Sequence, residues 1–182
     1  YRYTAGDAVM AKKIILFFLI VLTVGLDSTL IPSFAVWDIQ INLTLCVVVA
    51  LGIVFGPMTG TVTGLLAGYI MDLLFGPARG FYMLIYMLVG YISTAIFSKG
   101  LQDSLVLYSL FVGCTYVVKE LATMLLTLLM GVNVGSVPTL LVRYILPSAV
   151  LTGFAGYVVY RLIRAMAQLN VMRNRKKKTG LG

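Results

Sequence analysis

Few residues of this sequence could take part in chemistry, and the strongest signal comes from the neighbours Lys119 and Glu120, which fall near the middle of a long apolar run. A charge at the centre of a membrane helix costs about 2.5 to 3.5 kcal/mol on insertion scales. Because successive residues diverge by about 100° around a helix, we expect the two charges not to neutralise each other fully. Three interpretations are open: a hydrogen-bonded pair that fixes helix register, a proton or ligand pathway, and a contact with a partner protein.

Asp72 and Arg143 are the other ionisable residues that we single out within apolar runs. A carboxylate in that setting is costly unless it is paired or solvated, so we expect Asp72 to form an ion pair with Arg79 or with Arg143. The chain has no histidine, and Cys46 and Cys114 stand apart in apolar runs as expected buried hydrophobes. These residue types do not favour general acid–base catalysis, a nucleophile–histidine pair or a zinc site, so we expect no enzyme, no metal and no other cofactor.

The elements that carry these residues are long and apolar. Of the 182 residues, 60% are hydrophobic and 11% are charged, which excludes an ordinary soluble domain. A span needs about 20 apolar residues, and only helices or closed barrels satisfy the backbone in lipid. The sequence therefore predicts an all-α, polytopic membrane protein, a bundle of six transmembrane helices. The expected spans are residues 14–31, 39–55, 57–75, 81–97, 104–130 and 139–162.

The flanking residues complete the expected domain organisation. Residues 1–9 precede Met10 and are interpreted as upstream or vector-derived sequence, residues 10–165 as the membrane domain, and residues 166–182 as a basic cytoplasmic tail. Lys and Arg total 14 against 6 Asp and Glu, and most lie at the termini or near residue 99, which predicts cytoplasmic termini. Asp27, Asp38 and Arg79 are then expected to face the exterior.

The tail is expected to attract anionic lipid, since cations beside a membrane each contribute about 1 kcal/mol. A nucleic-acid role is not favoured, because no folded reading module accompanies the basic run. The expected lipid-binding residues are Arg173, Arg175, Lys176, Lys177 and Lys178.

Glycine recurs at every fourth position along the expected third span, except where Asp72 takes its place. Residues four apart share one face of a helix, and a row of small residues lets another backbone approach closely. Two interpretations are open, internal helix packing and a groove for a partner helix. The candidate packing residues are Gly56, Gly60, Gly64, Gly68, Gly76, Gly80 and Gly90.

One segment of the chain resembles the MreD family, the rod shape-determining membrane proteins of bacteria. The resemblance rests on Gly64-Leu65-Leu66-Ala67-Gly68, Asp72-Leu73-Leu74, Gly76, Gly80, Leu84, Tyr86 and Val89-Gly90-Tyr91. It implies a non-enzymatic scaffold of the bacterial cytoplasmic (inner) membrane, a subunit of the elongation complex that controls cell shape and lateral-wall peptidoglycan synthesis. The implied partners are MreC and, indirectly, MreB, RodA and a penicillin-binding protein. We expect the glycine face and parts of the adjoining helices to organise a packed bundle that receives a transmembrane helix of MreC.

The family is also similar in fold to the substrate-binding subunits of energy-coupling-factor vitamin transporters, which supply the alternative function. Those subunits carry an Ala-xxx-Ala pattern near the first helix for docking, whereas residues 14–24 contain no alanine. A vitamin site would also call for longer outer loops, and residues 131–138 form a short uncharged turn. We therefore expect the scaffold function.

Overall fold

The computed structural model describes residues 5–33, 40–76, 79–97, 104–132 and 137–167. All regular secondary structure in these ranges is helical, so the predicted all-α class is confirmed. In chain order the elements are α1 (Ala5–Ser33), α2 (Leu43–Phe55), α3 (Pro57–Phe75), α4 (Phe81–Phe97), α5 (Leu105–Leu129), α6 (Val137–Leu140), the π-helical segment η3 (Leu141–Ile145) and α7 (Leu146–Ala167).

Three of these helical segments are long and apolar enough to cross a membrane: α3, α5 and the continuous stretch Leu141–Ala167. The apolar helices α2 and α4 have 13 and 17 residues. At 1.5 Å per residue α2 spans about 20 Å, which is less than the roughly 30 Å of a hydrocarbon core. The protein is therefore a membrane protein by the length and composition of these helices.

Three of the expected spans differ from the helices of the structure in extent or regularity. We expected the first span to begin at residue 14, whereas α1 begins at Ala5 and includes residues that we had set aside as upstream sequence. The second helix begins at Leu43 instead of residue 39, because the Asn42 side chain accepts the backbone N–H of Leu45 and so caps the helix. The expected sixth span is interrupted by the five π-helical residues of η3.

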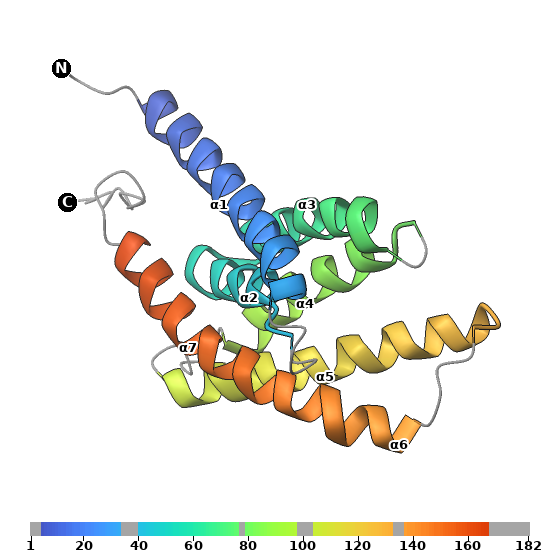
Figure 1. The fold of residues 1–182 in the computed structure, drawn as a ribbon. Coiled ribbons are helices and arrows are strands. Elements are labelled where there is room, and N and C mark those ends of the chain that lie inside the picture. The colour runs from blue at the N-terminus through green and yellow to red at the C-terminus, as the bar shows by residue number, and fades with distance from the viewer. Residues whose placement is uncertain (1–4, 34–39, 77–78, 98–103, 133–136, 168–182) are drawn as a thin grey trace.

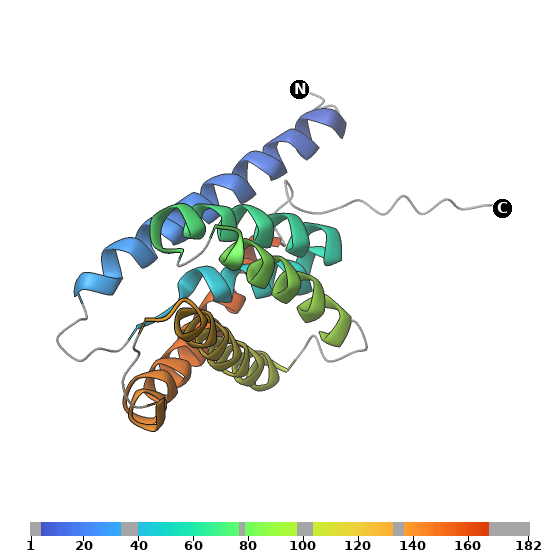
Figure 2. The same cartoon turned by 90° about the vertical axis from the view of Figure 1, so that its right-hand side faces the viewer.

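Helix α2 forms the centre of the molecule, and every residue from Thr44 to Ile53 is buried. Helices α3 and α4 form an antiparallel pair on one side of it and α5 and α7 a second pair on another, while α1 crosses the bundle (Figures 1 and 2). A helix enclosed by neighbours needs apolar residues all round, which explains the unbroken apolar run of α2. Cys46 of α2 is buried as expected, but Cys114 of α5 is exposed.

Candidate functional site

Three glycines of α3 place its backbone directly against α4. A Cβ atom added at Gly68 would lie 2.5 Å from the Met83 Cα, and one added at Gly64 would overlap the Tyr86 carbonyl oxygen. Gly60 and Gly90 meet reciprocally, each occupying the space that the other's side chain would need. Internal helix packing therefore accounts for this seam of four glycines. The glycine face is filled by α4, so it is not the open groove of the second interpretation.

The remaining candidate glycines have other physical causes. Gly56 and Gly80 have φ angles of 98° and 91°, in the left-handed region, and a Cβ atom added at either would meet nothing within 4 Å. They allow the chain to reverse between helices and do not form a packing surface. Gly76 ends α3, where its backbone N–H donates to the Asp72 carbonyl oxygen at 3.2 Å.

Asp72 binds the beginning of α4. Its two carboxylate oxygens accept the backbone N–H groups of Tyr82 and Met83, each at 2.9 Å. The first N–H groups of a helix lack partners within the helix and carry partial positive charge, so they compensate the carboxylate. The expected ion pair with Arg79 or Arg143 is absent from the described part of the chain. Arg79 is exposed, and the Arg143 guanidinium lies 5.9 Å from the ring centroid of Tyr144.

Asp27 uses the same contacts at the beginning of α2. Its carboxylate accepts the N–H groups of Leu43 at 2.9 Å and Thr44 at 2.8 Å, and the residue is 1% exposed. The expectation that Asp27 lies on the exterior side of the membrane stays a prediction, whereas its burial against the start of α2 was not expected. The helical spacing of Leu16, Ile20, Val24 and Asp27 was the signal that we missed, since it places the carboxylate on the buried face of α1.

Lys119 and Glu120 form an ion pair with 2.5 Å between Nζ and Oε1. We expected the two charges not to neutralise each other fully because their directions around the helix diverge, but both side chains are long enough for the charged ends to meet. Lys119 is only 7% exposed, and its Nζ lies 5.2 Å from the ring centroid of Tyr116 and 5.6 Å from that of Tyr82. Among the described residues this is the one salt bridge, and it is held between aromatic rings.

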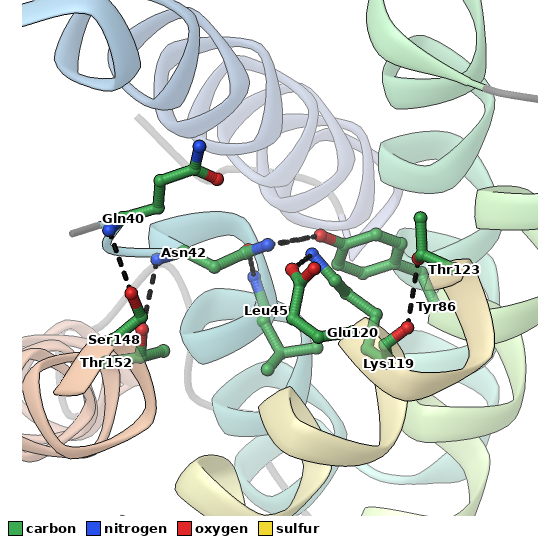
Figure 3. A network of polar contacts seen from close by, with 9 residues as sticks. All are labelled: Gln40, Asn42, Leu45, Tyr86, Lys119, Glu120, Thr123, Ser148 and Thr152. Atoms are coloured by element: carbon green, nitrogen blue, oxygen red, sulfur yellow. Dashed lines mark hydrogen bonds and ion pairs between the residues drawn. The ribbon is translucent and has the colours of Figure 1, made fainter. Parts of the chain in front are cut away.

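A cavity of about 200 Å³ opens beside this ion pair. Asn42 is the residue before α2, and its side-chain nitrogen donates to the Tyr86 hydroxyl oxygen at 2.9 Å (Figure 3). The backbone N–H of Asn42 donates to Thr152 Oγ1 at 3.3 Å. The backbone N–H of Gln40 donates to Ser148 Oγ at 3.0 Å. These bonds join α2 to α4 and α7 around the ion pair of α5. The polar residues lining the cavity are Asp27, Gln40, Asn42, Tyr82, Tyr86, Tyr116, Lys119 and Glu120.

A second cavity of about 440 Å³ adjoins the first and shares with it the residues Gln40, Tyr116 and Glu120. It runs between α5 and the η3–α7 segment, where Tyr144 and Ile145 of the π-helical turn form part of its wall. π-Helical turns shift side chains out of the α-helical register and are frequent at functional sites. The π-helical turn that interrupts the expected sixth span therefore forms part of the wall of this cavity.

The site brings together Lys119, Glu120 and the missed Asp27, whereas Asp72 and Arg143 are not among its lining residues. Asp38 and the tail residues Arg173, Arg175, Lys176, Lys177 and Lys178 lie outside the described residues. In the ranges that the structure describes, no group of three His, Cys, Asp or Glu side chains could hold a metal ion. Both carboxylates of the site are engaged, Asp27 by two backbone N–H groups of α2 and Glu120 by the Lys119 ammonium.

An apolar groove of about 750 Å³ lies between α1 and α3, apart from the polar cavities. Its lining residues are Lys13, Ile14, Leu16, Phe17, Phe18, Ile20, Met58, Thr59, Val62, Thr63 and Leu66.

Comparisons of the chain with protein-family models, with curated proteins and with solved structures find no match.

Proposed function

We propose that this protein is a non-enzymatic scaffold of the MreD type that binds a transmembrane helix of MreC in the bacterial inner membrane. The observation that carries the proposal is the apolar groove between α1 and α3. Its volume of about 750 Å³ is ample for several side chains of a partner helix. Because lipid is as apolar as leucine, such a helix would be held by close packing along the groove.

Helix α1 supports this assignment by the way it packs. Leu16, Ile20 and Val24 are buried against the bundle, whereas Phe17 and Phe18 are exposed beside the groove. Aromatic side chains bring large contact areas to an interface at a low cost in conformational entropy. The groove replaces the glycine face as the proposed docking surface, since α4 already fills that face.

The proposal also includes the number of membrane spans and the side of the membrane on which the termini lie. Six spans with both termini in the cytoplasm would place Lys13 and the basic tail beside anionic lipid. MreC would then connect the protein indirectly to MreB, RodA and a penicillin-binding protein. The protein's own contribution would be to hold MreC in place and so support lateral-wall peptidoglycan synthesis and cell shape.

Co-purification with MreC tests the docking surface through a matched pair of phenylalanines. Phe18 of α1 is 66% exposed at the groove, and Phe154 of α7 is 70% exposed elsewhere. We expect Phe18→Ala to reduce the recovered MreC by about fivefold or more, while Phe154→Ala leaves recovery unchanged, because only the first removes an aromatic anchor from the interface. Equal recovery with both variants would contradict the groove assignment, and no recovery with the unaltered chain would contradict the function.

The polar cavities are the observation that favours the second candidate, the substrate-binding subunit of an energy-coupling-factor vitamin transporter. A cavity with a few convergent polar groups is the usual form of a small-molecule site. Mass spectrometry of the purified protein distinguishes the candidates. A vitamin retained through purification supports the transporter subunit, and MreC retained in its place supports the scaffold.

A further inference from the structure

Among the residues that the structure describes, the cavities beside Lys119 and Glu120 have no lining residue in common with the α1–α3 groove. The proposed docking of MreC therefore gives them no role. Their sizes, about 200 and 440 Å³, lie in or near the range of small-molecule sites. The three residues shared between their walls place the two cavities side by side, so we treat them as one candidate site.

The charges facing the first cavity are balanced. The carboxylate of Asp27 is taken up by two backbone N–H groups at the start of α2, and Lys119 and Glu120 neutralise each other. An anion entering alone would meet the carboxylates of Asp27 and Glu120, and a cation entering alone would meet the Lys119 ammonium. A ligand that carries both charges avoids either conflict.

Such a ligand can exchange partners with the existing ion pair. Its anionic group would bind the Lys119 ammonium and its own ammonium would bind Glu120, so that two ion pairs replace one. The Tyr116 ring already lies within cation–π distance of the Lys119 ammonium and lines both cavities. Ring faces of this kind attract ammonium groups, which places the ligand's ammonium between Tyr116 and Glu120.

The second cavity has room for an apolar portion of the ligand. Met124, Leu140 and Ile145 contribute apolar walls, and Thr123 and Thr127 follow Glu120 along one face of α5. The hydroxyls of both threonines donate to the backbone of their own helix, to the carbonyl oxygens of Lys119 and Thr123. Of the three charged residues that line the first cavity, only Glu120 also lines the second, whose other walls are uncharged and in part apolar.

We propose that the two cavities bind a zwitterionic head group of the phosphoethanolamine kind, with phosphate on Lys119 and ammonium on Glu120, and an apolar chain in the second cavity. Phosphatidylethanolamine carries this head in the membrane, and free phosphoethanolamine carries it in solution. The proposal goes beyond the scaffold function and does not depend on it.

Native mass spectrometry of the full chain, purified in detergent without MreC, tests this assignment. We expect phosphatidylethanolamine to bind at least about tenfold more tightly than phosphatidylglycerol, whose head is anionic. Equal binding of the two lipids would overturn the proposal. Free phosphoethanolamine that displaces the lipid shows that the head alone suffices, whereas failure to displace it assigns the site to the lipid.

Two variants locate the preference at the cavity. Glu120→Gln should reduce the tenfold preference to less than about twofold, because the ligand's ammonium loses its partner. Asp72→Asn is the matched control, an acid-to-amide change that is not in the cavity wall, and should keep the preference. Unchanged preference in Glu120→Gln would overturn the proposal. If that variant does not fold, Thr127→Leu, which narrows the second cavity and leaves the ion pair intact, should weaken lipid binding by at least fivefold, and unchanged binding would overturn it.

Discussion

The glycine seam and the polar cavity use opposite means to hold helices together. At the seam, α3 and α4 approach until the backbone of one helix touches that of the other, and nothing larger than hydrogen fits at Gly64. At the cavity, long side chains from several helices meet around an ion pair, and space remains between them. The seam depends on volume and the cavity on charge balance, so each should respond to a different kind of substitution.

The two aspartates provide a second contrast within the same comparison. Asp27 beside the cavity and Asp72 beside the seam each accept two backbone N–H groups at the start of a helix. Asp27 is fully buried and Asp72 is half-buried. The same hydrogen bonds should therefore contribute different amounts to stability in the two places, because an unpaired group costs more where water cannot reach it.

The largest effect is expected when a side chain is forced into the seam. Gly64→Leu would push α3 away from the Tyr86 carbonyl oxygen, and we expect a loss of about 3 kcal/mol or more, or failure to fold. Thermal unfolding in detergent measures the loss. Gly25→Leu on α1 is the matched control, because a Cβ atom there would meet nothing within 4 Å. Equal stability of the two variants would show that the seam is not closely packed.

Breaking the charge balance of the cavity should have the next largest effect. Lys119→Met leaves Glu120 without its partner, which we expect to cost about 3 kcal/mol, while the double variant Lys119→Met/Glu120→Gln should recover at least half of the loss. Unfolding temperatures of both single variants and the double variant complete the thermodynamic cycle. Additive losses would indicate that the ion pair contributes nothing as a pair.

The comparison of the two aspartates predicts the smallest effects. Asp27→Ala should cost about 2 kcal/mol and Asp72→Ala about 1 kcal/mol, because both remove the acceptor for two N–H groups but only Asp27 is inaccessible to water. Unfolding of both variants under one set of conditions provides the measurement. A larger loss of stability for Asp72→Ala than for Asp27→Ala would contradict the expectation that the buried carboxylate contributes more.

Much of the framework could be predicted because it depends on local signals. The bounds of α3 and α4 follow from Gly56-Pro57 and from Gly80, where turn residues separate apolar runs. The four-residue spacing of the glycines predicted a packing face, although Gly56 and Gly80 proved to serve turns. The composition predicted a membrane protein, and three helices have the length and hydropathy to span a bilayer.

The cavity could not be predicted in the same way because its parts are distant in the sequence. Asp27 and Thr44 are 17 positions apart, and the Asn42 backbone is joined to Thr152 across 110 positions. Asp72 was assigned to an arginine because sequence spacing shows which charges are near in the chain but not which backbone N–H groups are near in space. For Lys119 and Glu120 we expected incomplete neutralisation, because helix geometry gives the direction of each Cβ atom but not the position of the end of a long side chain.

By itself the sequence determined that this chain is helical and apolar, and where α3 and α4 begin and end, because hydrophobicity and turn preference act over a few residues. Tertiary structure decided which helix fills the glycine face, which N–H groups meet each aspartate and where space is left beside Lys119. Those outcomes depend on how whole helices pack around α2, which is a property of the assembled chain and not of any one segment.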